Sequence, residues 1–187
     1  MNVIIFGPPG AGKGTQAHNI VKKFNLSQVS TGDLLRSEIS NKTNIGKDIE
    51  NTISKGDFAT DEIVNELIKN VVFDPQKRNK LIFDGYPRSL SQAKNLNLLL
   101  NSTNQKIDFI FFLNVNKDTI IKRIKKRKIL EKRTDDDLAT ILKRYDTYME
   151  TTKPVLDFYS KNTNFYEVDG TEEIGVISSK INQILTV

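Results

Sequence analysis

A glycine-rich stretch directly after a short apolar run carries the strongest chemical signal in the chain. The run at residues 3–6 is followed by residues 7–16, which read GPPGAGKGTQ. Glycines let such a loop turn its backbone N–H groups inward around an anion, and the following helix adds the positive end of its dipole. Lys13 can then reach the outer phosphates of a nucleotide. The usual pattern has a hydroxyl where Gly14 stands, so Thr15 becomes the candidate to contact a phosphate or its Mg²⁺.

Arginine usage gives a second, independent signal. The chain has 21 lysines against 7 arginines, and arginine is the residue whose planar fork binds phosphate in a bidentate way. Six of the seven arginines fall near the elements suspected of forming a site: Arg36, Arg88, Arg123, Arg127, Arg133 and Arg144. Isolated surface ion pairs remain the alternative for any one of them, whereas all six together favour an anionic ligand. Arg78 is the one arginine that does not fall near a suspected site element.

The apolar pattern predicts the scaffold that positions these groups. Continuous apolar runs at 3–6, 81–83 and 109–113 are typical of strands covered on both faces, and residues 28–30 and 164–168 can add two more. With helical segments between them, these runs predict a doubly wound α/β fold with a five-stranded parallel sheet. In such sheets ligands bind at the carboxyl ends of the strands, which is where the glycine loop and residues 84–88 fall.

Two segments do not look like helices that cover the sheet. Residues 30–59 offer short helical pieces with candidate caps at Thr31 and Thr43, and predict a small helical insertion. Residues 122–133 hold Lys or Arg at eight of twelve positions and predict a short mobile flap. The remaining helices are expected at about 60–72, 135–161 with a bend near Pro154, and 172–185.

The length, composition and net charge of the chain exclude several classes of protein and of binding site. A length of 187 residues suits a single large domain, and the absence of cysteine excludes disulfides and cysteine-bound zinc. No apolar run approaches the ~18 residues of a membrane span, and no leader is evident, so we expect a cytoplasmic protein. The net charge of +5 fits an anionic ligand but is too diffuse to require nucleic acid. Nothing suggests an oligomer, so a monomer is expected.

Taken in order, the motifs resemble those of the adenylate kinase family along essentially the whole chain. The matching residues are GPPGAGKGT at 7–15, STGDLLR at 30–36, DGYPR at 84–88 with Gln92, Arg123, Arg127, RTDD at 133–136, Arg144 and VDG at 168–170. The resemblance implies one nucleotide kinase domain, 1–187, of the P-loop NTPase type. Within it, residues 30–59 would bind the nucleoside monophosphate and residues 127–133 would form a short lid. The implied reaction moves the terminal phosphoryl group of Mg-ATP to AMP and gives two ADP.

The resemblance also implies a role for individual residues. The ATP site would comprise Gly10, Ala11, Gly12, Lys13, Gly14, Thr15, Arg123 beside the adenine, Arg127 on the phosphates and the main chain of Glu172. The AMP site would comprise Thr31, Arg36, Asp57, Phe58, Ala59, Gly85, Tyr86, Pro87, Arg88 and Gln92, with Arg133 and Arg144 bridging toward the transferring phosphates. The catalytic set would be Lys13, Arg88, Arg127, Arg133 and Arg144.

The chemistry of the remaining residues agrees with a phosphate acceptor. A hydroxyl acceptor needs a general base, whereas the phosphate of AMP is already a nucleophile, and the single histidine, His18, is expected to be an ordinary helix residue. Catalysis would then rest on positioning and charge neutralisation. Thr15, Asp33 and Asp84 could orient Mg²⁺ through water, with helix capping or ion pairing as the alternative for the two aspartates. The short lid without cysteines implies no zinc.

Three other functions remain to be separated from this one. A UMP/CMP kinase shares the fold and the arginines, and the Gln92 amide favours adenine because it offers both a donor and an acceptor. A GTP-dependent switch would need a guanine motif that residues 116–118 match poorly, and a nucleotide-binding regulator without turnover is the other alternative of this class. Nucleic-acid binding at 122–133 lacks aromatic residues for stacking.

Overall fold

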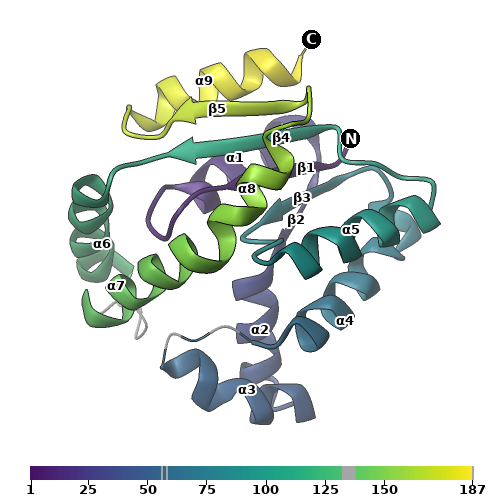
Figure 1. Ribbon diagram of the computed structural model, residues 1–187, viewed down its shortest axis with the longest axis horizontal. Helices are drawn as coiled ribbons and strands as arrows, with labels where there is room; N and C mark the ends of the chain where they lie inside the picture. Colours follow the sequence, from purple (N-terminus) through teal and green to yellow (C-terminus); the bar gives the residue numbers. More distant parts are fainter. Residues whose placement is uncertain (56, 58, 132–137, 187) are drawn as a thin grey trace.

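A five-stranded parallel sheet forms the centre of the molecule (Figure 1). The computed structural model describes residues 1–55, 57, 59–131 and 138–186, with the side chains of 126–131 and 138 left aside. The strands run in the order β2-β3-β1-β4-β5. Their bounds are β1 Val3–Phe6, β2 Ser27–Ser30, β3 Leu81–Asp84, β4 Phe109–Asn114 and β5 Phe165–Asp169. The predicted α/β class, strand number and parallel direction are confirmed, with strand ends correct to within one residue.

The strands read as unbroken apolar runs because both faces of the sheet are buried. Along β1, Ile4 and Phe6 pack into the core on one face, while Val3 and Ile5 pack into the core on the other. All four side chains are at most 2% exposed. The same alternation in β3 and β4 builds two hydrophobic layers on one sheet.

Helices from different parts of the sequence cover the two faces. On one side α4 packs against α5 and α5 against α8, and on the other α1 packs against α9. Their bounds are α1 Lys13–Phe24, α4 Asp61–Val72, α5 Leu90–Ser102, α8 Lys153–Tyr159 and α9 Ile174–Leu185, with a single 3₁₀ turn η1 at Pro75–Lys77. None of the helices in the described ranges is long and apolar enough to cross a bilayer.

The insertion between β2 and α4 contains two helices, α2 Thr31–Ser40 and α3 Asn44–Ser54. They pack against each other and extend below the sheet in Figure 1. Thr43 caps α3 as expected, its hydroxyl accepting from the Gly46 N–H at 3.0 Å. The expected cap at Thr31 is wrong, because Ser30 accepts from the Asp33 N–H and Thr31 is already the first helical residue.

The basic segment is more helical than its charge suggests. Helix α6 spans Lys117–Glu131, so residues 122–131 continue a helix and do not form a separate flap. Lysine and arginine are good helix formers, and Ile120 and Ile124 bury the inner face of α6 in the core. The lid at 127–133 falls largely outside the described side chains and stays a prediction.

The long helix expected at 135–161 is interrupted close to the predicted bend. Helix α7 spans Leu138–Thr147, a π-helical turn η2 follows at Tyr148–Thr152, and α8 begins at Lys153 with Pro154 in its first turn. Proline is tolerated there because the first-turn N–H groups have no partner within the helix. The interruption thus lies at the π turn just before Pro154.

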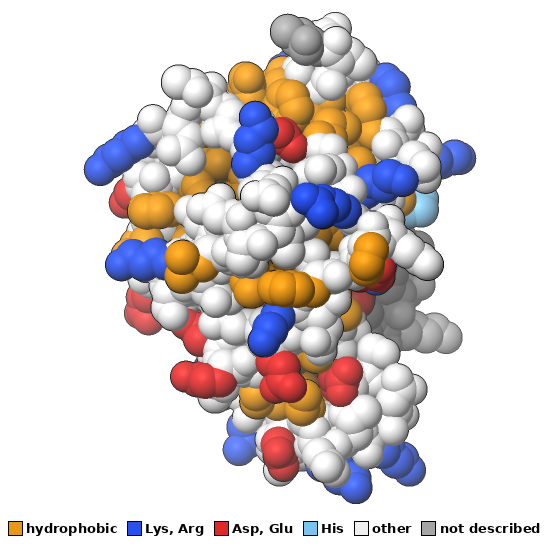
Figure 2. Space-filling view, turned by 90° about the vertical axis from the view of Figure 1, so that its right-hand side faces the viewer, with side chains coloured by type: hydrophobic (Ala, Val, Ile, Leu, Met, Phe, Trp, Pro, Cys, Tyr) orange, Lys and Arg blue, Asp and Glu red, His pale blue; other side chains and the backbone are white. Residues whose placement is uncertain are grey.

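The surface in Figure 2 shows no single broad patch of one charge. Lys and Arg side chains are spread over most of that face, with Asp and Glu side chains gathered toward its lower half. Interspersed charges of this kind are typical of a solvated surface.

The close approach of α2 and α3 predicts that Gly46→Ala destabilises the insertion. A Cβ at Gly46 would lie 2.1 Å from the Glu38 carbonyl oxygen, so the two helices must move apart. We expect a loss of about 2 to 3 kcal/mol in the free energy of unfolding, measured by urea denaturation, and faster hydrogen exchange in α2 and α3. The matched control is Gly175→Ala, where nothing lies within 4 Å, and a slight gain in stability is expected. Equal effects of the two substitutions would contradict this packing.

Candidate functional site

A large cleft opens at the carboxyl ends of the central strands. Its volume is about 1050 Å³, enough for ligands larger than one nucleotide. It lies between the glycine loop, the insertion and the first turns of α5. Of the residues predicted for the site, the following line it: Gly10, Ala11, Gly12, Lys13, Gly14, Thr15, Thr31, Asp33, Arg36, Asp57, Ala59, Asp84, Gly85, Pro87, Arg88, Gln92, Arg123 and Arg144.

The glycine loop has the geometry that its sequence predicts. Gly10 and Gly12 adopt positive φ angles of 81° and 95°, which side chains with a Cβ rarely adopt, and Gly12 caps α1. The Lys13 ammonium donates to the carbonyl oxygens of Gly7 at 2.7 Å and Pro8 at 3.1 Å, which holds the lysine across the loop. The loop therefore places a cation and a helix N-terminus together at one point.

Arg123 joins the two chain segments that were predicted to meet at one nucleotide. Its guanidinium donates to the Ala11 carbonyl oxygen at 3.2 Å and to the Glu172 carbonyl oxygen at 3.4 Å. It thus connects α6, the glycine loop and the segment after β5. The structure brings Arg123 and the main chain of Glu172 together beside the loop.

The guanidinium of Arg88 is held by hydrogen bonds and lies near two other arginines in the cleft. Its Nε donates to the Gly85 carbonyl oxygen at 2.6 Å, and one terminal nitrogen donates to the Thr31 hydroxyl at 3.4 Å. Burial lowers the pKa of Arg88 to about 10, opposed by the nearby carboxylate of Asp84 and assisted by the like charges of Arg144 and Arg36. Arg88 remains charged at neutral pH, so three guanidinium groups repel each other here.

The amide of Gln92 belongs to a hydrogen-bond network. Its oxygen accepts from the Arg88 backbone N–H and its nitrogen donates to Asp61, each at 2.7 Å. Asp61 was not recognised as part of the site from the sequence, where it falls at the start of the helix expected at about 60–72. No local signal connects it with Gln92, which lies 31 residues further along the chain.

Three further residues of the cleft were not predicted from the sequence. Thr152 donates from its hydroxyl to the Arg88 carbonyl oxygen at 3.2 Å, and Gln28 donates to Asp84 at 3.1 Å. Both line the cleft, together with the ring of Tyr148. Thr152 and Tyr148 come from the π turn and Gln28 from the edge strand β2, and their sequence neighbourhoods carry no motif.

The acidic residues fit a hydrated magnesium ion bound mainly through phosphates. Asp84 ends β3, and a Cβ at Gly14 would lie 3.5 Å from its carboxylate, so this carboxylate lies against the start of α1. Asp33 forms an ion pair with Arg36. In the described part of the chain no three acidic, histidine or cysteine side chains cluster around a potential metal. Mg²⁺ typically uses one or two carboxylates together with phosphate oxygens and water, which this arrangement can supply.

Some predicted residues are placed elsewhere or lie outside the description. Tyr86 does not line the cleft, because its side chain is fully buried beneath it. Phe58, Arg133 and the side chain of Arg127 lie outside the described residues.

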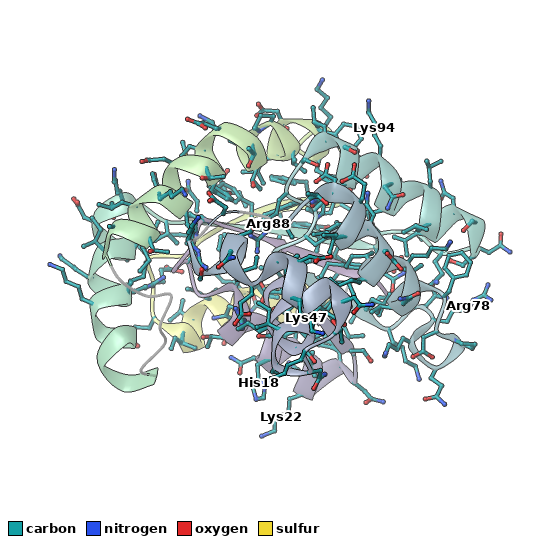
Figure 3. The ribbon with its side chains drawn as sticks, turned by 90° about the horizontal axis from the view of Figure 1, so that it is seen from below. His18, Lys22, Lys47, Arg78, Arg88 and Lys94 are labelled. Carbon is teal, nitrogen blue, oxygen red and sulfur yellow. The ribbon has the colours of Figure 1, made fainter. Side chains whose placement is uncertain are left out.

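Figure 3 shows Arg88 near the middle of the molecule, whereas Arg78, which had no predicted role, lies at its outer edge. His18, expected to be an ordinary helix residue, is exposed on α1 and lines the cleft.

A glycine loop that joins the first strand of a parallel sheet to a helix, next to a cleft lined with arginines, defines a P-loop nucleotide-binding protein of the α/β class. Comparison with known families is more specific. The family model described as "Adenylate kinase" matches residues 5–164. This chain belongs to the adenylate kinase family.

Curated relatives agree along the full chain. An adenylate kinase of Pelagibacter ubique is 51% identical over 213 aligned positions, which cover 100% of each chain. An adenylate kinase of Mycoplasma capricolum subsp. capricolum is 39% identical, covering 90% of this chain and 91% of the relative. An adenylate kinase of a Nocardioides species is 35% identical over 187 positions, covering 100% and 98%.

Three buried tyrosines around the floor of the cleft predict a loss of stability in alkali. Burial raises the pKa of Tyr86 to about 12, and it raises the pKa values of Tyr148 and Tyr159 further. An unfolded chain releases these protons near pH 10 while the folded chain keeps them, so stability is complete below about pH 10 and falls above it. Each such group contributes a fall of about 1.4 kcal/mol per pH unit, and the lowered pKa of Arg88, which acts in the opposite direction, offsets one of the three above about pH 10. Urea denaturation at several alkaline pH values measures this slope.

Tyr86→Phe provides the internal check. It removes one of the three tyrosine protons and should make the fall shallower by about 1.4 kcal/mol per pH unit. It also removes the hydroxyl that donates to Asn65 at 3.0 Å and to the Gln92 carbonyl oxygen at 3.2 Å, which should cost about 1 kcal/mol at neutral pH. An unchanged slope in this variant would show that Tyr86 ionises as readily in the folded chain as in the unfolded one.

Proposed function

We propose that this chain catalyses the reversible transfer of the terminal phosphoryl group of Mg-ATP to AMP, giving two ADP. The chain is a phosphotransferase by family. The observation that supports this particular reaction is the meeting of the glycine loop, Arg88, Arg36 and Arg144 in one cleft. That combination provides cations for two phosphate chains at once.

Phosphoryl transfer between two anions requires their repulsion to be cancelled. The loop N–H groups and Lys13 would bind the phosphates of ATP, and Arg88 and Arg36 would bind the phosphate of AMP. Mg²⁺ supplies further neutralisation of the ATP phosphates when it is bound. Since the attacking phosphate oxygen is already anionic, the residues need only align it in line with the donor and stabilise the charge that develops.

The proposal includes individual roles that follow the resemblance. Arg123 and the main chain of Glu172 would hold the adenine of ATP, and Thr31, Gly85 and Gln92 would hold AMP. Arg127, Arg133 and Arg144 would approach the transferring phosphoryl group, with 127–133 acting as a short lid and 30–59 as the nucleotide-binding insertion. Closure of both would exclude water, which protects the donor from hydrolysis. We further propose a monomer that works in the cytoplasm with Mg²⁺ and without zinc.

In this conformation the insertion already contacts the opposite side of the cleft. Lys143 on α7 pairs with Asp57 at 2.6 Å and donates to the Lys55 carbonyl oxygen at 3.4 Å. Both charged groups of the pair are about half exposed, so the ion pair contributes at most ~1 kcal/mol. A contact this weak is easily broken, which suits an insertion that must open to admit AMP.

An acceptor panel tests the reaction. Protein, Mg²⁺ and ATP are mixed in turn with AMP, UMP, CMP and GMP, and the nucleoside diphosphates are separated by chromatography. We expect rapid formation of ADP from AMP and slow reaction with the other three. Faster use of UMP or CMP would identify a pyrimidine nucleotide kinase, and binding of ATP without turnover would identify a regulator.

Gln92→Ala tests which nucleotide each part of the cleft holds. Loss of the amide should lower kcat/KM for AMP by about 10- to 100-fold, as expected when a base loses its polar partner. The KM for ATP should stay nearly constant because the glycine loop is untouched. Gln183→Ala on α9, outside the cleft, is the matched control. Equal losses for AMP and ATP in Gln92→Ala would contradict the assignment.

A further inference from the structure

The orientation of the Gln92 amide is determined by two partners of opposite character. The backbone N–H of Arg88 can only donate, and it meets Oε1 at 2.7 Å. The ionised carboxylate of Asp61 can only accept, and its Oδ1 meets Nε2 at 2.7 Å. Turning the amide by 180° would place two donors against each other on one side and two acceptors on the other.

Asp61 is itself firmly held. Its second oxygen, Oδ2, accepts from the Ser89 hydroxyl at 2.7 Å, and the same hydroxyl accepts from the Gln92 backbone N–H at 3.1 Å. Asp61 is also the first residue of α4, where the helix dipole favours a negative charge. Asp61, Ser89 and Gln92 therefore form a closed network that joins the start of α4 to the start of α5.

The network leaves part of the amide available. Among the residues that the structure describes, Gln92 makes one side-chain hydrogen bond at each end of its amide. One hydrogen on Nε2 and one lone pair on Oε1 remain. The side chain is 4% exposed and lines the cleft, so these two groups are available to a ligand bound there.

That remaining pair distinguishes two classes of purine. Adenine presents an acceptor at N1 beside a donor at N6, which complements one donor and one acceptor on the amide. Hypoxanthine and guanine present the reverse pair, a donor at N1 beside an acceptor at O6, and these would require the amide to be turned over. A site built to hydrogen-bond one pattern rejects the other because buried polar groups are left unpaired.

We propose that Asp61 is a positioning residue that selects adenine over 6-oxopurines by fixing the orientation of the Gln92 amide. The proposal rests on the proposed function, in which Gln92 reads the base of AMP. Asp61 does not touch the nucleotide in this account. It acts by making the turned amide unfavourable.

Asp61→Asn tests this role. Asparagine has nearly the same shape, but it can offer either an oxygen or an amide hydrogen to Gln92, so both orientations become acceptable on that side. We expect the ratio of kcat/KM for AMP to kcat/KM for inosine monophosphate to fall about tenfold, the factor for losing one charge-assisted hydrogen bond. Inosine monophosphate is the appropriate probe because it carries O6 and N1–H without the additional amino group of guanine.

The matched control is Glu62→Gln. Glu62 follows Asp61 in the first turn of α4 and is exposed, so this variant removes the same charge from the same helix end without touching Gln92. It should leave the AMP to inosine monophosphate ratio unchanged. A change equal to that of Asp61→Asn would mean that helix charge, not amide orientation, sets the ratio, and would overturn the proposal.

Further measurements separate the possible failures. If the wild type forms no ADP from AMP, the proposed function fails; if it does so, and Asp61→Asn is folded by circular dichroism but keeps the wild-type ratio, only the role of Asp61 fails. Should Asp61→Asn not fold, Ser89→Ala decides, because it frees Asp61 on one side and should lower the ratio about threefold. An unchanged ratio in folded Ser89→Ala would then overturn the proposal.

Discussion

Repulsion among arginines is the constraint on which the site depends. Arg88 lies four residues after β3 in a partly buried position; burial lowers its pKa, and the like charges of Arg144 and Arg36 lower it further. Such a cluster is unfavourable in an empty cleft and becomes favourable when anions enter it. The fold must therefore hold these cations in place by other means, and the hydrogen bonds from Arg88 to Gly85 and Thr31 serve that purpose.

The parallel sheet makes this arrangement possible. Because β1 and β3 are neighbours and parallel, the glycine loop after one strand and residues 84–88 after the other emerge at the same edge. Two buried layers on either side of the sheet fix these strands, so their ends are rigid. The insertion and α7, joined across the cleft by an exposed ion pair, are attached more weakly. Rigidity therefore lies where charges must be placed, and weaker contacts lie where substrates must enter.

The sequence predicts the sheet and the glycine loop well because both depend on local patterns. Continuous apolar runs locate three of the strands, the stretches at 28–30 and 164–168 locate the other two, and the spacing of glycines with Lys13 locates the loop. What the sequence alone misses depends on contacts between distant segments. The pairing of Asp61 with Gln92 and the support of Arg88 by Thr152 are examples. The flap predicted from the high charge of residues 122–133 is wrong for 122–131, which continue helix α6. Helix propensity and the burial of Ile120 and Ile124 decide the structure of this helix.

Calorimetric titration with diadenosine pentaphosphate, a ligand that tethers two adenosines through one polyphosphate chain, tests most directly whether one arginine-lined cleft holds two nucleotides end to end. The account predicts one ligand per chain, an affinity that falls as salt is raised, and binding at least 100-fold weaker in Arg88→Met, as expected for loss of a partly buried charged partner of phosphate. Two independent ligands per chain, or equal affinity in wild type and Arg88→Met, would contradict it.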